Sequence, residues 1–475
     1  MGILHHFPYD TPRQGQAELL LALEKHWNSA DVFVIVAPTA FGKSACMRTI
    51  QQWQHSVSAI TPTNMLVDQF LEEFPESPTL HRLDSYHCEK WDSSCASTRG
   101  RQKAFCKGCK CSSDLATARY RKGPGIYNYY TYLAHRLERQ ALVVDEAHNL
   151  VSTIRDRLSE TIWLHDYPQL SGAVSVASVG PRLAKLTTKQ KKHKKILLLE
   201  EAVTATAPKY VVEFGEEWFN GKGTKRGDPE LRRCIKLLPV DIGESIGMFL
   251  MQDTKKLILL SATIGHVDIT ELGLQHKKVL YLNAEHPITP EHRPVQLLNT
   301  AALSHGNMEQ CVPALVREIE AIAAYHKGEK GVVHVTYRLA SLLAPHLGGR
   351  FIFHDQGNKR EMYEYFRESD PAEGRVLVAC GMYEGIDLPD DLGRWQVIAK
   401  TPWKSLGDPA IKYKAEQDPD WYLWRTCIDL IQACGRICRH EEDYGITYIL
   451  DSTATRLIEQ AEHLIPRWFK DAIYE

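Results

Sequence analysis

The sequence predicts an α/β protein with two parallel-sheet domains. Runs of apolar, β-branched residues, which are typical of strands buried on both faces, recur along the chain. They lie at 32–37 (VFVIVA), 141–144, 257–260, 332–336, 375–379, 395–399 and 446–450. Helical patterns separate these runs, and such alternation indicates parallel sheets with helical crossovers. The units are too numerous for one compact sheet, and a connector rich in Pro and His at 282–295 divides them.

Two stretches interrupt the alternation in the first half of the chain. Residues 82–122 hold five cysteines, and residues 151–250 are mostly helical in pattern. We therefore expect a first domain at 1–281 that carries a cysteine-rich insertion at 82–122 and a helical insertion at 151–250. A second domain is expected at 282–475.

Composition excludes several classes of protein. Of the 475 residues, 44% are hydrophobic and 24% are charged, which is ordinary for a globular protein and rules out a disordered chain or a small disulfide scaffold. The net charge of −2 excludes a wholly basic protein that coats nucleic acid, but not an enzyme with local basic patches. There is no apolar run of about 20 residues and no secretory signal at the start. Scattered cysteines in apolar surroundings are typical of reducing compartments, so we expect a cytoplasmic protein without membrane contact.

A phosphate-binding loop is expected at 37–44 (APTAFGKS), between the first strand and a helix. Backbone N–H groups at the start of a helix attract anions. Lys43 can then reach the β- and γ-phosphates of a nucleotide and Ser44 can ligate Mg²⁺. Thr39 and Gly42 belong to the same turn and are expected to contact the nucleotide. The strict motif has one more Gly, so the loop alone is equally consistent with an ordinary strand–turn–helix.

A pair of carboxylates follows the second strand, in the sequence LVVDEAH at 142–148. At a strand end beside a phosphate loop, Asp145 is placed to hold Mg²⁺ and Glu146 to polarise the attacking water. His148 would connect this pair to the rest of the domain. A solvated acidic strand end is the alternative interpretation, and the GKS sequence argues against it.

Five cysteines lie close together in the sequence: Cys88, Cys95, Cys106, Cys109 and Cys111. Four converging thiolates suit either an iron–sulfur cluster or a tetrahedral zinc ion. Basic and aromatic side chains interleave around them, which suits the phosphates and bases of a single strand but also a solvated loop. A basic run at 181–195 has two similar interpretations, contact with DNA phosphates or an exposed helix face.

Taken in order, these motifs resemble those of superfamily 2 helicases. Besides GKS and DEAH, the chain has TPT at 61–63, SAT at 261–263, GMYEGIDLP at 381–389 and QACGRICR at 432–439. More narrowly, it resembles the DinG/XPD branch, in a compact phage or bacterial form. The cysteines before DEAH, the long insertion before SAT and the sequence VIAKTPWKSLGDP at 397–409 carry this narrower resemblance, which covers nearly the whole chain.

The resemblance implies roles for four residues around a nucleotide. Arg13 and Gln16 match the early R-x-x-Q of the branch, and an amide such as that of Gln16 can bind the adenine edge through paired hydrogen bonds. A polar surface pair is the alternative for these two. Gly385 and Asp387, in the sequence EGID, would contact the nucleotide or its sensor residues when the cleft closes.

A helix predicted at 423–439 carries the late motif. Gln432, Gly435, Arg436 and Arg439 are expected on it, and the spacing of 432, 436 and 439 places them on one face. Two guanidinium groups on one face suit the charge that develops in phosphoryl transfer, and in the family such residues act as arginine fingers. A basic surface stripe is the alternative.

The resemblance as a whole implies an ATP-dependent DNA helicase with two RecA-like domains and an arch-like helical insertion. ATP and Mg²⁺ would be its cofactors, and four of the five cysteines would hold a [4Fe–4S] cluster, with Zn²⁺ as the alternative. As a monomer it would move 5′→3′ on single-stranded DNA and open forked or tailed duplexes, in DNA repair or replication, in the cytoplasm of a bacterium or a phage-infected cell.

Two alternative functions stay open at this point. One is an ATP-driven translocase or remodeller that acts on RNA or protein–DNA complexes without true unwinding. The other is a nucleic-acid-binding scaffold with a vestigial ATPase. The second is disfavoured by an intact set of candidate catalytic residues: Lys43, Asp145, Glu146, Arg436 and Arg439.

Overall fold

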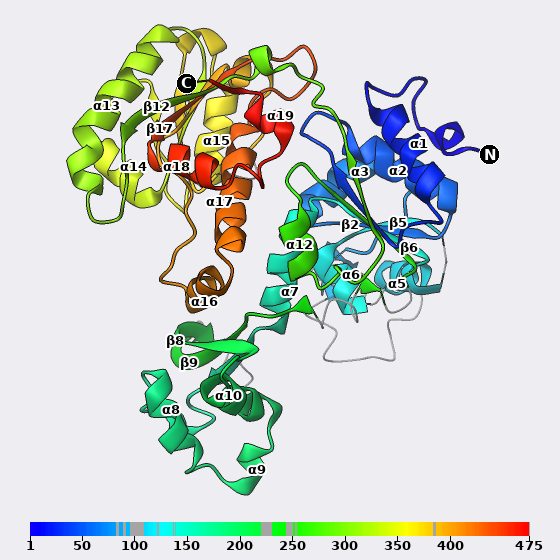
Figure 1. Cartoon of the computed structure of the whole chain (residues 1–475), viewed down its shortest axis with the longest axis vertical. Helices are drawn as coiled ribbons and strands as arrows, with labels where there is room; N and C mark the ends of the chain where they lie inside the picture. Colours follow the sequence, from blue (N-terminus) through cyan, green and yellow to red (C-terminus); the bar gives the residue numbers. More distant parts are fainter. Residues whose placement is uncertain are drawn as a thin grey trace.

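The computed structural model describes most of the chain (Figure 1). The described residues are 1–81, 85–88, 92–95, 109–120, 123–135, 137, 139–219, 230–243, 250–251, 254–382 and 386–474. Two of the predicted site residues, Cys106 and Gly385, lie outside them. Within the described ranges, no helix combines the length and the apolar character needed to cross a membrane.

The first sheet has six parallel strands. Their spatial order is β11 (Val279–Asn283), β1 (Val32–Val36), β10 (Lys256–Ser261), β6 (Ala141–Val144), β2 (Val57–Thr61) and β5 (Gly125–Asn128). The predicted strands at 32–37, 141–144 and 257–260 are confirmed as β1, β6 and β10, three adjacent interior strands that are almost wholly buried.

Helices cover both faces of the first sheet. Successive residues of each strand point to opposite sides, so a strand that is apolar throughout, such as β1, needs cover on both sides. Phe33 and Ile35 pack with the helices of one face, and Val32 and Val34 pack on the other. The first face is covered by α1 (Gln16–His26), α2 (Lys43–Gln54) and α3 (Asn64–Glu73). The second face is covered by α5 (Lys110–Tyr120), α6 (Tyr129–His135), α7 (Leu150–Leu158) and α12 (His266–Glu271).

The second sheet has seven parallel strands. Their order is β14 (Phe351–Ile352), β15 (Val376–Cys380), β13 (Gly331–Val335), β16 (Trp395–Ile398), β17 (Ile446–Asp451), β12 (Val295–Ala301) and β18 (Ile473–Tyr474). One face packs against α13 (Met308–Tyr325) and α14 (Tyr337–Leu343). The other packs against α15 (Lys359–Glu368), α17 (Pro419–Cys434), α18 (Thr453–Gln460) and α19 (Arg467–Lys470). The fold is therefore α/β with two parallel sheets, as predicted, whereas the exact domain bounds stay a prediction.

The segment between α7 and β10 forms a separate layer below the two sheets (Figure 1). It contains the expected helices, α8 (Val176–Leu183), α9 (Thr188–Lys191) and α10 (Lys194–Thr204), but it is not only helical. A three-stranded antiparallel sheet, β7 (Glu160–Trp163), β9 (Glu230–Pro239) and β8 (Tyr210–Phe219), supports them. Its strands are half-exposed, so the apolar residues alternate with charged ones and the pattern lacks the continuous apolar runs of a central strand.

A helix of the second half of the chain lies against this antiparallel sheet. It is α16 (Pro409–Gln417), which contacts β8 and is followed directly by α17 (Figure 1). The inserted layer therefore touches elements from both halves of the chain.

Candidate functional site

Three predicted motifs meet at the carboxyl edge of the first sheet because β1, β10 and β6 are adjacent and parallel. Val36 at the end of β1 pairs with Ser261 at the end of β10, and Leu259 of β10 pairs with Val144 of β6. The phosphate loop, SAT and DEAH follow these strand ends. The carboxyl edge of a parallel sheet is where α/β proteins bind ligands, so the position suits a nucleotide site.

The phosphate loop turns sharply into α2. Ala40 and Gly42 both have left-handed backbone conformations, with φ of 68° and 79°. Lys43 is the first residue of α2 and Ser44 the second, so both side chains sit at the positive end of the helix dipole. This is the geometry expected of a loop that surrounds an anion.

Arg13 and Gln16 hold the phosphate loop from outside. The Gln16 amide nitrogen donates to the carbonyl oxygens of Phe41 at 2.6 Å and Gly42 at 3.3 Å, and its oxygen accepts from the Arg13 N–H at 2.8 Å. The Arg13 guanidinium donates to the carbonyl oxygen of Ala40 at 3.0 Å. The buried Gln16 is thus a part of the loop scaffold, and its contact with adenine stays a prediction.

Lys43 and Glu146 form an ion pair in the centre of the site. The Lys43 ammonium donates to Glu146 Oε1 at 2.7 Å, with both side chains largely buried. Burial alone would raise the pKa of Glu146, but the charges of Lys43, His148 and Arg436 outweigh it and hold that pKa below its ordinary value. Glu146 has a left-handed backbone with φ of 46°, a strained conformation that is common at functional sites.

Asp145 is more deeply buried than its neighbour. Its Oδ1 has no hydrogen-bond partner among the described residues, although a buried carboxylate oxygen ordinarily has one. Burial and the adjacent Glu146 carboxylate raise the pKa of Asp145. A bound cation would supply the missing partner of Asp145 Oδ1. It would also favour the ionised form of the Asp145 carboxyl. Together with the Ser44 hydroxyl at the start of α2, the oxygen-donor set fits Mg²⁺.

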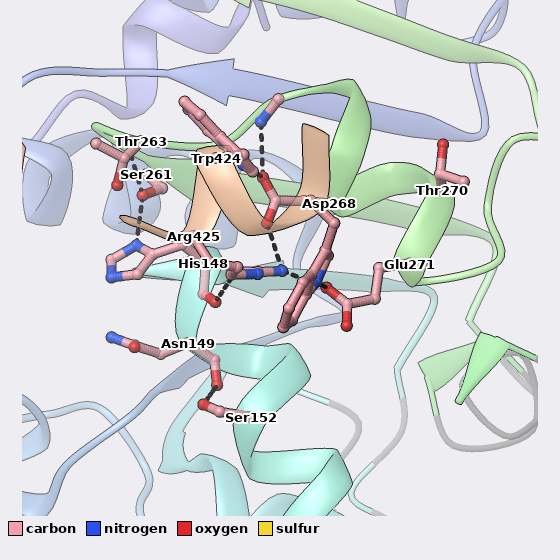
Figure 2. Close-up of polar contacts among 12 residues, drawn as sticks. His148, Asn149, Ser152, Ser261, Thr263, Asp268, Thr270, Glu271, Trp424 and Arg425 are labelled. Carbon is pink, nitrogen blue, oxygen red and sulfur yellow. Dashed lines mark hydrogen bonds and ion pairs between the residues drawn. The ribbon is translucent and has the colours of Figure 1, made fainter. Parts of the chain in front are cut away.

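A polar connection leads from this pair to the SAT segment. His148 Nδ1 lies 3.5 Å from Glu146 Oε2. The same nitrogen lies 2.7 Å from Ser261 Oγ (Figure 2). The backbone N–H of Thr263 donates to the same Ser261 oxygen at 3.0 Å. The expected coupling role of His148 therefore has a physical route, from DEAH to SAT.

The connection continues across the cleft into the second half of the chain. The Gln432 amide nitrogen donates to Thr263 Oγ1 at 3.0 Å, and its oxygen accepts from Arg436 Nη2 at 2.9 Å. Arg436 is close enough to Glu146 for its charge to lower the pKa of that carboxyl. Thr39 of the phosphate loop also faces this region, since a Cβ added to Gly435 would lie 3.5 Å from Thr39 Cγ2.

The prediction that a single helix carries the whole late motif is wrong. α17 ends at Cys434 and Gly435 caps it, so Gly435, Arg436 and Arg439 follow the helix instead of extending it. The backbone N–H of Arg436 donates to the carbonyl oxygen of Ala433 at 3.3 Å, which closes a tighter final turn. Gln432 and Arg436 still meet, because the turn folds the Arg436 side chain back onto Gln432.

Arg439 has a different partner from Arg436. Its Nε pairs with Asp387 Oδ1, and its backbone N–H donates to Asp443 Oδ2 at 2.8 Å. Asp387 therefore contacts the late motif directly. Gly385 of the same EGID segment lies outside the described residues, so its role stays a prediction.

Four of the five clustered cysteines, all but Cys106, lie in the described part of the first half of the chain. Cys88 ends β3 (His87–Cys88), which pairs with β4 (Ser93–Ser94), and Cys95 follows that hairpin. Cys111 lies at the start of α5; it and Cys95 are buried in one hydrophobic cluster, and Cys109 packs against it. Within the described residues no three of these thiols lie within 4.8 Å of one another, and Cys106 lies outside them, so a thiolate-bound metal stays a prediction.

Sequence analysis missed a buried charged cluster between α12 and α17. Asp268 and Glu271 of α12 face Trp421, Trp424 and Arg425 of α17. The residues of each helix are three or four apart and so share one face. That spacing is the only local signal, and it does not reveal that the two faces meet.

Two domain families match the chain. Residues 331–472 match the helicase C-terminal domain, and residues 10–170 match the res subunit of type III restriction enzymes. The curated relatives are regulator of telomere elongation helicase 1 homologs. That of Caenorhabditis briggsae is 25% identical over 123 residues, which is 22% of this chain and 12% of the relative. That of Drosophila sechellia is 29% identical over 105 residues, which is 19% of this chain and 11% of the relative.

Solved structures share the fold over the whole length. S. tokodaii Xpd4 has a TM-score of 0.61 at 16% identity, with 98% of this chain and 100% of that chain covered. An XPD helicase structure has a TM-score of 0.62 at 14% identity, with 98% of each chain covered. At these identities the likeness concerns the fold.

The phosphate loop, DEAH and SAT at the edge of the first parallel sheet, and the two domain-family matches, are features shared with superfamily 2 helicases. The chain is thus similar to XPD/DinG-like superfamily 2 helicases, as the sequence predicted. This similarity supports an ATP-hydrolysing helicase.

Proposed function

We propose that the chain is an ATP-dependent DNA helicase that moves 5′→3′ along single-stranded DNA and opens duplexes. The observation that carries the ATPase part of this proposal is the polar connection from Lys43 and Glu146, through His148, Ser261 and Thr263, to Gln432 and Arg436. The DNA substrate and the 5′→3′ direction rest on the resemblance to the DinG/XPD branch. It joins the phosphate loop of one domain to an arginine of the other. Such a connection links cleft closure to hydrolysis, because both depend on the same side chains.

Lys43 and Glu146 would change partners when a nucleotide binds. The ammonium that pairs with Glu146 at 2.7 Å is also the group that reaches the β- and γ-phosphates. A nucleotide competes for Lys43 and releases the Glu146 carboxylate, which can then accept a proton from the attacking water. Mg²⁺ held by Ser44 and Asp145 would neutralise phosphate charge. Arg436 would stabilise the charge that develops in the transition state.

The cysteines would hold a [4Fe–4S] cluster that shapes the segment around them. Supporting this proposal are the positions of Cys88 and Cys95 on a small hairpin and of Cys109 and Cys111 at the start of α5. A segment this short cannot bury a core of its own, so a metal would supply its stability. Zinc is the alternative group for the same thiols.

The inserted layer would contact the DNA backbone. The basic run at 181–195 lies on α8, α9 and α10, and Lys185, Lys189 and Lys192 are exposed there. Exposed lysines attract phosphates without regard to sequence and release counterions on binding. This part of the proposal predicts affinity for single-stranded DNA that falls with salt.

An ATPase assay with and without single-stranded DNA tests the first half of the proposal. The wild-type protein should hydrolyse ATP, faster with DNA present, and Lys43→Ala should abolish turnover while single-strand binding is kept, because the ammonium serves the phosphates. Lys25→Ala, on the exposed side of α1, is the matched control and should behave as wild type. Wild-type turnover by Lys43→Ala would reject the phosphate-loop assignment.

A strand-displacement assay tests the second half. Duplexes with 5′ or 3′ single-stranded tails, made of DNA or of RNA, should be compared with the same enzyme. We expect displacement of the 5′-tailed DNA duplex. Displacement of RNA alone, or DNA-stimulated turnover without displacement of any duplex, would instead favour a translocase or remodeller.

A further inference from the structure

α17 is attached to the first domain at two separate points. At its C-terminal end, Gln432 donates to Thr263 at 3.0 Å, next to the nucleotide site. Near its N-terminal end, Trp421, Trp424 and Arg425 contact α12. Two points fix the direction of a rigid helix, whereas one point would leave it free to pivot.

The second point of attachment is a buried carboxylate with cations from three helices. Glu271 Oε2 accepts from Arg425 Nη2 at 2.6 Å, and Glu271 Oε1 pairs with Lys414 of α16 and Arg155 of α7. The Trp421 indole N–H also donates to Glu271, at 2.7 Å. The Glu271 side chain is only 4% exposed. These cations hold the pKa of Glu271 well below its ordinary value against the effect of burial, so the carboxylate is ionised at neutral pH.

A second carboxylate, next to Glu271, adds hydrogen bonds of fixed direction between α12 and α17. Asp268, one turn earlier on α12, accepts from the Trp424 indole at 2.7 Å and pairs with Arg425 at 2.9 Å (Figure 2). Arg425 also donates to the carbonyl oxygen of His148 at 3.2 Å. One guanidinium thus contacts the helix that follows SAT and the segment that contains DEAH. Hydrogen bonds with fixed directions allow less sliding than apolar contacts do.

We propose that Glu271 is a positioning residue that fixes the direction of α17 and so holds Arg436, just beyond the end of that helix, against Glu146. The proposal rests on the ATP hydrolysis proposed above and adds a residue remote from the nucleotide. Within the described residues Glu271 contacts neither the phosphate loop nor Gln432, and its contacts with Trp421 and Arg425 give its effect a route through α17. A misplacement of about 1 Å at a catalytic group can cost roughly 100-fold in rate.

The test combines Glu271→Gln with Arg436→Ala in one double-mutant cycle. Arg436→Ala should lower kcat for ATP by about 10³-fold, the effect typical of an arginine finger. Glu271→Gln alone should lower kcat by about 10- to 100-fold with little change in KM, because the first domain binds the phosphates. The double variant should hydrolyse ATP no more slowly than Arg436→Ala alone, since Glu271 acts only through Arg436.

Glu271→Gln leaves the buried cations around it without a carboxylate, so this variant could fail to fold. A milder variant is therefore needed as a second test. Trp421→Phe removes one indole hydrogen bond to Glu271 and keeps the aromatic ring. Its matched control is Trp403→Phe, which removes an indole hydrogen bond of 3.0 Å to Thr453 that stays inside the second domain. Trp421→Phe should lower kcat at least threefold, and Trp403→Phe should leave it unchanged.

The outcomes separate this inference from the proposed function. Wild-type protein that hydrolyses no ATP, with or without DNA, would reject the proposed function. Turnover in the wild type with equal kcat for Trp421→Phe and Trp403→Phe would overturn the positioning role of Glu271. Multiplying losses in the double variant would overturn it too, because they would show that Glu271 acts independently of Arg436.

Discussion

Glu146 combines three properties that rarely occur in one residue: a left-handed backbone, a buried carboxylate and a lysine partner. Its φ of 46° follows the end of β6, and the Tyr129 hydroxyl donates to its carbonyl oxygen at 3.1 Å. The strained backbone is thus held by a neighbouring side chain, which keeps the carboxylate aimed at Lys43.

Glu146→Gln should bind ATP and hydrolyse it slowly. The amide cannot accept the proton of water, so kcat should fall by roughly 10²- to 10⁴-fold while nucleotide affinity is kept. Steady-state hydrolysis and titration with a fluorescent ATP analogue measure the two quantities. The exposed Glu200→Gln on α10 is the control. Lost affinity with turnover intact would mean that Asp145 and Glu146 have exchanged roles.

Gly42→Ala should weaken nucleotide binding. A Cβ at this position would lie 2.5 Å from Gln16 Nε2, and the φ of 79° disfavours any side chain. The conformational cost is about 1–2 kcal/mol, so we expect roughly tenfold weaker binding of the same fluorescent analogue. Gly348→Ala has open space and no positive φ, and should bind as wild type. Equal affinities of the two variants would show that the loop can adjust.

Local sequence was sufficient for the residues that follow strand ends. Asp145 and Glu146 come directly after a buried strand, and Lys43 begins the helix that the loop after another buried strand leads into, so their positions follow from the sheet itself. Gln16 was harder to interpret, because its partners are carbonyl oxygens of a loop more than twenty residues away. Glu271 could not be found at all, since its cations come from α7, α16 and α17.

At the scale of elements, the sequence predicted buried strands better than half-exposed ones and helix cores better than helix ends. The helix expected at 423–439 overlaps α17 (Pro419–Cys434) in its core, but α17 begins before residue 423 and ends at Cys434. Gly435, with φ of −84°, caps α17 at this point without a left-handed turn. Strands β8 and β9 were missed because each is long, charged and solvent-facing on one side.

Cys88→Ser and Cys111→Ser should each lose the metal and lose unwinding, yet keep much of the ATPase. The first belongs to the small hairpin and the second to α5, so each variant tests one of the two elements that carry the thiols. Metal analysis and absorption near ~400 nm, from thiolate–iron charge transfer, are the primary measurements.

Cys311→Ser, in a half-buried position of α13, is the control and should keep the iron. A colourless wild-type protein with about one zinc would reject the iron–sulfur assignment but keep the structural role of the thiols. Normal unwinding by both serine variants would contradict that structural role as well.

At the scale of the whole molecule, buried polar groups make stability depend on pH. His334 lies in β13, fully buried, with its Nε2 3.2 Å from Gln396 Oε1. Burial, with a smaller contribution from the Arg436 charge, lowers the pKa of His334 to about 4 from its ordinary 6.5. Between these two values the unfolded chain binds a proton that the native protein does not, so stability falls as pH falls through this window.

His334→Gln should flatten that dependence. From pH 7 to pH 5 the wild type should lose about 2 kcal/mol of unfolding free energy through this residue, and the variant should be spared that loss. Thermal unfolding of the full chain at both pH values measures the difference. His276→Gln, at an exposed position, should behave as wild type. A variant as pH-sensitive as the wild type would show that His334 is not the responsible group.

The two-domain plan was predictable because each sheet depends on local apolar runs, but the contacts between the halves were not. Arg155, Glu271 and Arg425 are far apart in sequence and carry no shared pattern, so only the folded chain shows that they meet. The same holds for Thr263 and Gln432. The two sheets can therefore be predicted from local sequence. The placement of the two halves of the chain relative to each other depends on long-range contacts that local sequence does not reveal.

The inserted layer leaves and rejoins the first domain at neighbouring points. Glu160, just after α7, pairs directly with Leu237, near the end of β9. A gene rearrangement could therefore lengthen, trim or exchange everything between these two residues without altering the strand order of the motor. Natural variation in this protein lineage should concentrate in the inserted layer between these two residues. Related proteins would then differ in this layer while they share the residues of the nucleotide site.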